Sequence, residues 1–377
     1  MRLKYVAREF DDRLGAEVTT LERLSVSQYR GVIPSSENSV RIQEPSSYEK
    51  YKVVQPGDLV LNRFNAYKGA LGISRYDGVV SPDYMTVKLD TSRVDIRYIE
   101  YFLRSVETSA AIKMSMSGMG SSDPDSSAFS RLDKDDLFNL PLPVTDLETQ
   151  CRIADYLDKE ISEMDALIEE FEGLASDLKK RVRVLRSKRI YGVTSNHLRK
   201  LWSIVQKVND ISHSKVFIAL DNMSGWTGRA DPQISETAVE GTPYQTGDLL
   251  FGKLRPYLAK VYQAESSGVA VGDIHVYRPS IEVDPTFLKH LLLTPEFISY
   301  AKMSSNGVKM PRVEWTSLSQ FKFALPPIEA QHNLALELDE ELSNTNTLIE
   351  ESTRLIENLK ARKTALITEV VTGRKEV

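Results

Sequence analysis

The sequence predicts a mixed α/β (α+β) protein in which two similar domains are joined by two long antiparallel coiled-coil helices. Three observations support this fold class. The chain has 377 residues, enough for two domains at roughly 100–200 residues each. It contains an internal repeat that spans both halves. Each copy of the repeat ends in a long apolar heptad pattern.

The repeat is clearest in its helical part. Residues 147–185 and 328–366 are identical at 16 of 39 aligned positions, at an offset of 181. Within them, the run Leu167–Glu170 returns unchanged as Leu348–Glu351. Two copies of one unit in a single chain predict a pseudo-two-fold relationship between the halves.

The segments before the helices also correspond. Gln55–Leu59 resembles Gln245–Leu249 at an offset of 190, so the order is domain, helix, domain, helix. The predicted boundaries are 1–143 for the first domain, 144–192 for the first helix, 193–324 for the second domain and 325–377 for the second helix.

An apolar seam with alternating steps of four and three residues runs along each helical segment, as in coiled coils. The first seam consists of Leu157, Ile161, Met164, Ile168, Phe171, Ala175, Leu178, Val182 and Leu185. The second consists of Leu338, Leu342, Thr345, Ile349, Ser352, Ile356, Leu359, Lys363 and Leu366. About 40 residues at ~1.5 Å each predict helices roughly 60 Å long. Asp146 and Pro326–Pro327 are expected to start them, and Gly192 and Gly373 to lie near their ends.

Three arrangements could bury these seams. Each helix could belong to the core of its own domain, or the two could pack on each other. The polar seam positions Thr345, Ser352 and Lys363 also allow the second helix to pair across chains. We favour the intrachain pair, because the weaker second seam needs a stronger partner and a pseudo-two-fold makes that pair antiparallel.

Short strands and turns characterise the two domains. Gly57–Leu61 and the alternating Met85, Val87 and Leu89 indicate strands, and Asp77-Gly78 is typical of a hairpin turn. Residues 115–130 are rich in Ser, Gly and Asp and predict a long exposed loop, whose counterpart is 304–312. Long loops at equivalent places in both halves are where binding is expected.

No catalytic or metal-binding motif is present in the sequence. The single cysteine, Cys151, excludes an intrachain disulfide and a cysteine-cluster metal site. The five histidines are dispersed, and for Asp273 and His275 on one strand face a hydrogen bond is favoured over a metal pair. Gly118-Met119-Gly120 lacks the third glycine of a dinucleotide fingerprint. We therefore expect a non-catalytic chain that holds no cofactor and no metal.

The sequence offers no element for membrane insertion. No run of 18 apolar residues occurs, and Met1–Tyr5 carries no apolar segment. The expected location is the cytoplasm.

The charge distribution restricts any nucleic-acid surface to local patches. The net charge is −5, divided as −1, −2, +2 and −4 over the four predicted segments. Asn62–Lys68 and Lys253–Lys260 each place cations and aromatics after a strand, at an offset of 190. A solvated turn is the alternative, but recurrence in both halves favours contact with phosphates and bases. The candidate DNA-contacting residues are Asn62, Arg63, Asn65, Tyr67, Lys68, Lys113, Ser117, Ser121, Lys253, Arg255, Tyr257, Lys260, Ser305, Asn306, Lys309 and Arg312.

Several motifs resemble those of type I restriction-modification specificity subunits. They are Ile153–Asp158, the helix entry Leu325–Gln331, the run Ala365–Gly373, and the strand starts Gly57–Val60 and Gly247–Leu250. Each motif is short, but their duplicated order is specific, and the resemblance covers the whole chain. The first helix entry departs from the family pattern, reading Leu-Pro-Val-Thr-Asp-Leu-Glu.

The resemblance implies a DNA-recognition subunit with no active site of its own. Two target-recognition domains would read the two halves of a bipartite sequence in double-stranded DNA. The helical pair would set the spacer and dock two modification subunits, which bring S-adenosylmethionine. Restriction subunits, which use ATP and Mg²⁺, would join that complex. The expected coiled-coil and partner positions are Leu157, Ile161, Met164, Ile168, Phe171, Leu178, Leu338, Leu342, Ile349, Ile356 and Leu359.

An alternative from another class fits the same helices. A coiled-coil protein-interaction scaffold would use them to hold two partners apart. Such a scaffold would not bind DNA sequence-specifically, even with its partners present.

Overall fold

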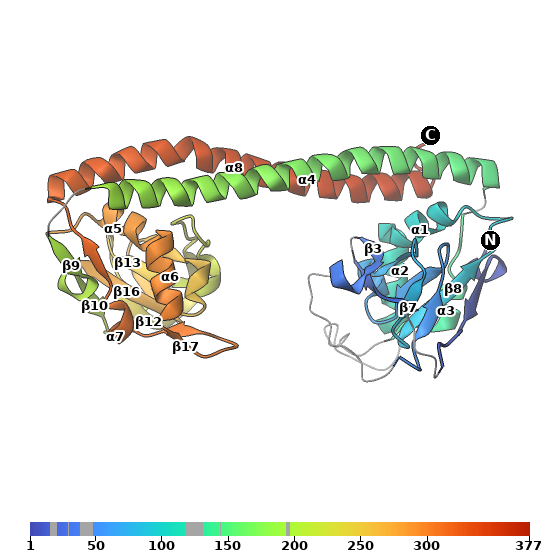
Figure 1. Cartoon of the computed structure of the whole chain (residues 1–377), viewed down its shortest axis with the longest axis horizontal. Helices are drawn as coiled ribbons and strands as arrows, with labels where there is room; N and C mark the ends of the chain where they lie inside the picture. Colours follow the sequence, from blue (N-terminus) through green and yellow to red (C-terminus); the bar gives the residue numbers. More distant parts are fainter. Residues whose placement is uncertain (16–20, 29, 38–47, 118–130, 144, 194–196) are drawn as a thin grey trace. The chain divides into compact units, whose positions relative to one another are not determined.

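The computed structural model describes residues 1–15, 21–28, 30–37, 48–117, 131–143, 145–193 and 197–377. These residues form two compact units, Met1–Glu170 with Leu355–Val377, and Phe171–Arg354. Two long helices, α4 (Leu147–Gly192) and α8 (Ile328–Val371), contribute to both units. Each unit therefore contains one sheet domain, one part of α4 and one part of α8 (Figure 1).

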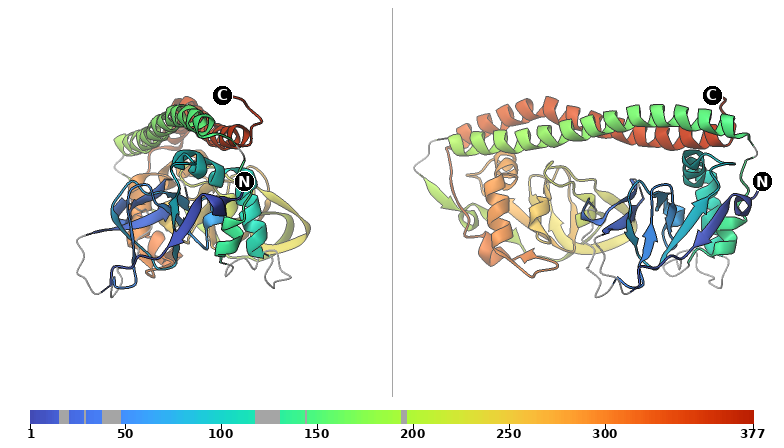
Figure 2. Two further views of the ribbon diagram at one scale, coloured as in Figure 1. Left: turned by 90° about the vertical axis from the view of Figure 1, so that its right-hand side faces the viewer. Right: turned by 45° about the vertical axis from the view of Figure 1, so that its right-hand side comes forward.

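Within each unit α4 and α8 run side by side in opposite directions (Figure 2). In the first unit Leu157 and Ile161 of α4 share a core with Leu366 and Val370, near the end of α8. In the second unit Val182 and Ile190, near the end of α4, share a core with Leu338 and Leu342. The predicted antiparallel intrachain pair is confirmed.

Two of the three polar residues of the second seam, Ser352 and Lys363, have partners within the chain. Lys363 is half-buried, and its Nζ donates to both carboxylate oxygens of Asp165 at 2.7 Å. Ser352 is buried, and its Oγ donates to the carbonyl of Leu348 one turn earlier, at 2.7 Å. Because both groups find partners within the chain, neither of these two residues requires a second chain.

The described residues of the first unit form two four-stranded sheets and three short α-helices, besides their parts of α4 and α8. One sheet has the order β1-β8-β5-β6 and is antiparallel throughout, and the other has the order β3-β2-β7-β4 with β2 and β7 parallel. The strands are β1 (Ala7–Phe10), β2 (Glu22–Ser27), β3 (Gly31–Pro34), β4 (Lys52–Val54), β5 (Leu59–Asn62), β6 (Leu71–Ile73), β7 (Gly78–Val80) and β8 (Tyr84–Leu89). The helices are α1 (Ile96–Arg104), α2 (Val106–Ser117) and α3 (Lys134–Phe138).

The second unit repeats the first antiparallel sheet as β10-β16-β13-β14, beside a closed three-stranded barrel of β11, β12 and β15. The strands of these two layers are β10 (Val205–Val208), β11 (Ser212–Ala219), β12 (Gln233–Tyr244), β13 (Leu249–Gly252), β14 (Val261–Gln263), β15 (Gly268–Val271) and β16 (Ile274–Pro279). Two small ladders pair β9 (Leu198–Lys200) with β19 (Lys322–Ala324), and β17 (Ser305–Asn306) with β18 (Arg312–Val313). The helices are α5 (Pro285–Leu292), α6 (Pro295–Met303) and α7 (Trp315–Leu318). The mixed α/β class is confirmed.

The turn predicted at Asp77-Gly78 does not join two paired strands. Strand β6 before it pairs with β5, whereas β7, which begins at Gly78, pairs with β2 and β4. Gly78 is required for close packing, because a Cβ there would lie 2.5 Å from the carbonyl oxygen of Glu22. Asp77-Gly78 predicted a hairpin turn, but Gly78 instead allows two strands to approach closely.

The predicted loop at 115–130 is shorter at its start than expected. Residues 115–117 form the last turn of α2, and the Ser115 hydroxyl donates to the carbonyl of Ile112 at 2.9 Å. That back-bond satisfies the hydroxyl inside a helix, so a serine-rich composition did not end the helix here. Residues 118–130 lie outside the described residues.

Both long helices begin beside a buried glutamine. Asp146 caps α4, accepting from the Thr149 N–H at 2.8 Å. In the first unit the Gln150 side chain accepts from the Asp95 N–H and donates to the Thr145 carbonyl. In the second unit Gln331 accepts from the Asp284 N–H at 3.0 Å and donates to two carbonyls, those of Glu282 and Pro326.

The prolines and glycines expected near the other helix ends lie within two residues of the observed ends. Helix α8 begins at Ile328, so Pro327 precedes its first turn instead of occupying it. Helix α4 ends at Gly192, and Gly373 follows α8 with a left-handed φ of 74°.

Candidate nucleic-acid interface

In the second unit two predicted binding segments form one surface. The turn after β13 contains Lys253 and Arg255, and the β17–β18 hairpin replaces the predicted loop. The Val313 N–H donates to the Lys253 carbonyl at 3.0 Å, and the Arg255 N–H donates to the Pro311 carbonyl at 2.7 Å. These main-chain bonds fasten the hairpin to the turn. Figure 1 shows the hairpin projecting from its domain on the side away from α4 and α8.

The cationic side chains of this surface differ in how accessible they are to an external anion. Arg312 donates to Asp273 Oδ2 at 2.8 Å, and Lys253 Nζ lies 3.9 Å from the other oxygen of that carboxylate. Asp273 therefore partly neutralises both. Arg255 and Lys309 are exposed, and their side chains have no ion pair or hydrogen bond with any described residue. Their charges are the ones most accessible to an external anion.

The turn that carries Arg255 is conformationally unusual. Arg255 has a φ of 49° and Ala259 a φ of 50°, on either side of the short 3₁₀ helix η7 (Pro256–Leu258). A non-glycine residue in this region is uncommon and costs of order 1–2 kcal/mol. Strained backbone of this kind concentrates at functional sites. Tyr257, between these residues, leaves 41% of its surface exposed.

Other candidates in this unit are engaged within the fold. Lys260 donates to the Leu220 carbonyl at 2.7 Å, and its side chain is only 17% exposed. The Ser305 hydroxyl donates to the Ala301 carbonyl at 2.7 Å. Asn306 is exposed at the end of β17. The structure thus separates residues that build the surface from residues that point outward.

The first unit repeats the same junction. The Leu132 N–H donates to the Arg63 carbonyl at 2.9 Å, just as Val313 bonds to Lys253 in the other half. Here the side chain takes part as well, because Arg63 Nε donates to the Leu132 carbonyl at 2.8 Å. Burial lowers the pKa of Arg63 from its ordinary value. The turn after β5 is therefore fastened to the segment that follows residues 118–130.

The remaining candidates in the first unit are distributed around this turn. Asn62 accepts from the Phe64 N–H at 3.1 Å, and Asn65 is half-buried. Lys68 is exposed with its ammonium 5.3 Å from the centre of the Tyr67 ring, which packs on the core. Lys113 is exposed on α2, Ser117 is the last residue of that helix, and Ser121 lies outside the described residues.

A buried carboxylate lies behind each turn, and the sequence patterns did not single it out as a functional residue. Asp248 accepts from the Gln245 N–H and receives two bonds from Arg278, at 2.8 and 3.0 Å. Asp58 accepts from the Gln55 N–H in the same way and pairs with Lys88 at 2.6 Å. The repeated Gly-Asp-Leu motif therefore fixes the start of the strand that delivers each turn. The recurrence of this motif in both halves is the sequence signal that could have identified the two carboxylates.

The structure offers no metal site among the residues it describes. These residues contain no group of three or more histidine, cysteine and carboxylate side chains placed to hold a metal ion. His275 bonds to the Tyr277 hydroxyl at 2.9 Å, and burial lowers its pKa to about 3, while Asp273 holds Arg312. In the described part of the chain, no helix is both long enough and apolar enough to span a bilayer.

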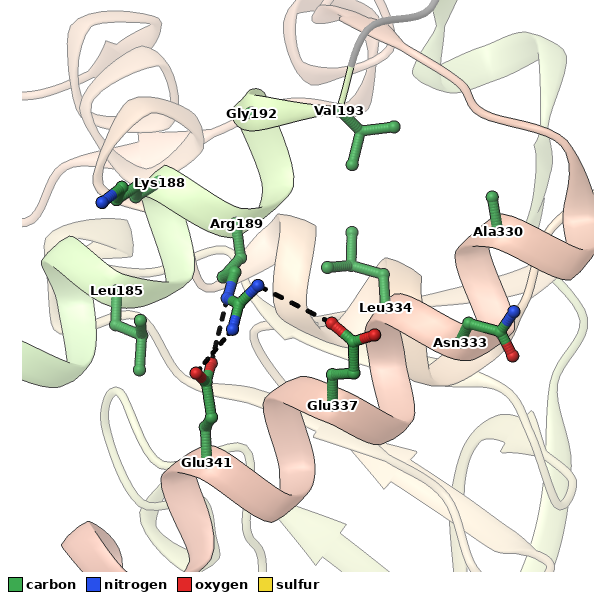
Figure 3. A pocket seen from close by; sticks show the side chains of 10 residues that line it. All are labelled: Leu185, Lys188, Arg189, Gly192, Val193, Ala330, Asn333, Leu334, Glu337 and Glu341. Carbon is green, nitrogen blue, oxygen red and sulfur yellow. Dashed lines mark hydrogen bonds and ion pairs between the residues drawn. The ribbon is translucent and has the colours of Figure 1, made fainter.

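A second surface feature lies where α4 ends beside the start of α8. A cavity of about 740 Å³ is lined by residues of both helices, including Leu185 and Leu334. Figure 3 shows Arg189 reaching across it, with bonds of 2.6 and 3.0 Å to Glu341 and an ion pair of 3.7 Å to Glu337. These ion pairs join the two helices at their solvent side.

Comparison with known proteins supports the resemblance seen in the sequence. No model of a known protein family matches the chain. A stretch of 183 residues is 24% identical to the type I restriction enzyme EcoDI specificity subunit of Escherichia coli. The match covers 45% of this chain and 40% of that relative, so the chain spans less than half the length of the relative it matches.

Solved structures extend the likeness to the whole fold. A chain solved in work on complex assembly and conformational transition of the type I R-M system has a TM-score of 0.65 and 16% identity, covering 98% of this chain and 96% of that one. The chain is thus similar in sequence to a type I restriction specificity subunit over part of its length, and similar in fold to a chain from a type I R-M system. The HsdS subunit of Thermoanaerobacter tengcongensis, with a TM-score of 0.47 and 16% identity over 100% of this chain and 96% of its own, is more distant.

The two junctions occupy equivalent positions in the two halves of the chain. Arg63–Leu132 and Lys253–Val313 are related by the internal repeat and lie at the same place in each domain. Each half of the chain therefore has one candidate interface.

Proposed function

We propose that this chain is the DNA sequence-specificity subunit of a type I restriction-modification complex, without a catalytic site or cofactor of its own. The observation that carries the proposal is the duplicated junction of a strand-following turn with a second segment. Each junction presents polar and cationic groups, and each belongs to a separate copy of the repeat. Two copies of one reading surface suit a target with two halves.

The proposed division of labour follows the predicted domains. Residues 1–143 and 193–324 are the target-recognition domains, and residues 144–192 and 325–377 are the helices that set the spacer. The helix pair also docks two modification subunits, which bring S-adenosylmethionine, and restriction subunits that use ATP and Mg²⁺ join them. The exposed ion-paired surface around Arg189 gives one docking position on the pair.

The charge of the chain is consistent with shared DNA binding. A net charge of −5 leaves little general attraction for a polyanion. Specific local cations such as Arg255 and Lys309 can still contact phosphates or guanine. We propose that partner subunits supply most of the remaining phosphate contacts.

Methylation of the host genome tests this function directly. Single-molecule sequencing would compare the methylome with the gene intact, deleted and restored. Loss of one split motif on deletion, and its return on restoration, is the expected result. It would also read out both half-sites and their spacer. A methylome that does not change, in a host expressing the modification subunit, would contradict the proposal and favour the protein-interaction scaffold.

A binding measurement links the function to the surface. Complexes with the modification subunits would be titrated with a duplex carrying the motif, over a range of salt concentrations. Arg255→Ala is expected to reduce the slope of log K against log salt by about 1 if it contacts a phosphate. Lys322→Ala is the matched control, because Lys322 is an exposed cation on β19, outside the junction.

A further inference from the structure

The β17–β18 hairpin has an apolar tip in a polar setting. Val308 is 104% exposed and Met310 is 53% exposed, with Lys309 between them. Single exposed apolar side chains are ordinary on protein surfaces. Two at the end of one projecting hairpin, beside a candidate binding surface, indicate contact with a partner.

The tip is supported by a fixed base. The β17–β18 ladder pairs Ser305 with Val313 and Asn306 with Arg312. The base is also bonded to the turn through the Pro311 carbonyl and through Asp273. These bonds hold the two strands of the hairpin while the tip projects beyond them.

The tight tip itself depends on a glycine. Gly307 has a φ of 95°, and a Cβ there would lie 3.3 Å from the Met310 carbonyl oxygen. The left-handed conformation favours glycine. The sequence thus permits a narrow turn that ends in Val308 and Met310.

The cations around the tip favour a polyanion as its partner. At the tip Lys309 is an exposed cation, whereas Arg312 at the base is paired with Asp273, and the next carboxylate along the chain is Glu314, after the hairpin. Arg255 adds an unpaired cation at the base, and the nearby Asp273 is already occupied by Arg312 and Lys253. An apolar tip flanked by positive charge is complementary to stacked bases between two phosphate backbones.

On the basis of the proposed DNA-recognition function, we propose that Val308 and Met310 act as a wedge that inserts at a base step in the half-site read by the second unit. Apolar wedges of this kind partly unstack a base step and bend the duplex. Pyrimidine–purine steps unstack most easily, so the wedge would favour such a step at its position. The hairpin would then contribute to specificity through the deformability of DNA, in addition to hydrogen bonds with base edges.

Fluorescence of 2-aminopurine provides the test. The probe would replace individual bases of the target identified from the methylome, in complexes containing the modification subunits. The wild-type complex is expected to raise the fluorescence at one step of the second half-site. In the double variant V308S/M310S the rise at that step is expected to fall to the level of free duplex, with affinity for the target lower by about tenfold.

Three controls separate the possible outcomes. Any base extruded by a modification subunit raises the signal irrespective of the tip, so only tip-dependent fluorescence counts. Ile281→Ser removes an equally exposed apolar side chain (99% exposed) elsewhere in the unit and should leave the signal unchanged. Lys309→Ala should weaken binding and lower its salt dependence while preserving the signal.

The wedge and the proposed function fail in different ways. Specific binding by the wild type with no tip-dependent fluorescence at any step would overturn the wedge and leave the specificity role intact. Absence of sequence-specific binding by the wild-type complex would overturn both. Thermal melting of each variant checks that the exposed substitutions leave the fold unchanged.

Discussion

His290 Nε2 lies 2.9 Å from Asp339 Oδ1, in a buried position between α5 and α8. On the other side of the ring, Arg186 Nε donates to His290 Nδ1 at 3.3 Å. Because Nδ1 accepts this bond, the ring proton resides on Nε2 and is donated to Asp339. Burial lowers the pKa of His290 to about 4. The histidine is therefore neutral in the folded unit at neutral pH.

Mild acid should destabilise the second unit selectively. His290 titrates near 6.5 when unfolded and near 4 when folded, so the unfolded state binds more protons between these values. Stability should fall by up to about 1.4 kcal/mol per pH unit as the pH drops below 6.5. Buried His275 acts in the same direction, whereas Asp339, with a pKa of about 2, affects stability only below about pH 4.

Hydrogen exchange at pH 7 and pH 5.5, corrected for intrinsic rates, would measure this effect. All five histidines lie in the second unit, so α5 should lose protection while α1 keeps it. Equal loss in α1 and α5 would contradict the assignment.

The buried arginine in this network is expected to be replaceable. When the two repeat copies are aligned, Ile367 corresponds to Arg186 and Tyr101 corresponds to His290. In the first unit the Tyr101 hydroxyl donates to Asp158 at 2.6 Å. Arg186 is 2% exposed, and its Nη1 has no hydrogen-bond partner among the described residues. The double variant R186I/H290Y should therefore be within about 1 kcal/mol of wild type, or more stable.

Removing only the Asp339 carboxylate should destabilise the second unit. Asp339→Ala leaves the buried His290 and Arg186 without their carboxylate, at a cost of about 3 kcal/mol. Urea denaturation monitored within the second unit would compare the two variants. A larger loss in R186I/H290Y than in Asp339→Ala would show that the arginine is indispensable.

The glutamine at the entry of α8 should be important for stability. Gln331 is fully buried and makes three hydrogen bonds to main-chain groups, so Gln331→Leu leaves those groups unpaired. The expected loss in free energy of unfolding is about 2–4 kcal/mol. Asn333→Ala, at an exposed position of the same helix, is the matched control and should change stability by less than about 0.5 kcal/mol. Similar midpoints for both variants in urea would argue against the role given to Gln331.

Arg63 and Arg255 should differ in what their removal affects. Arg63→Met breaks the bond to the Leu132 carbonyl and should destabilise the first unit by about 1–3 kcal/mol. Arg255 makes no side-chain bond to a described residue, so Arg255→Ala should leave the melting temperature nearly unchanged and lower DNA affinity. Calorimetry and DNA titration of both variants would distinguish these roles. A destabilised Arg255→Ala chain with unchanged DNA affinity would reverse the assignment.

The helices were predictable because their evidence is periodic and duplicated. Seam residues such as Leu157 and Leu338 recur at a spacing that only a helix places on one face, and the 181-residue offset links the two copies. Strands such as β5 and β13 were found through their buried apolar runs. Local pattern and burial agree in these elements, so sequence alone was sufficient.

The candidate site was less predictable, because tertiary contacts decide which cationic side chains are free to contact DNA. Arg63 and Lys260, like Arg255, are cations in a short segment that follows a strand. Each of the two nevertheless donates to a carbonyl that is distant in sequence. No local pattern identifies such a carbonyl. Gly78 shows the same limitation, since the strand that approaches it begins at Glu22.

The glutamines at the two helix entries have a consequence for how the chain can change over time. Among the described residues, the Gln331 side chain bonds only to main-chain atoms of Asp284, Glu282 and Pro326, and the Gln150 side chain only to those of Asp95 and Thr145. Main-chain atoms are the same whatever residue supplies them. Each attachment is therefore insensitive to the side chains of the domain it holds. A lineage could exchange or rewrite either domain wholesale, and acquire new preferences, while the same two glutamines continued to fasten it.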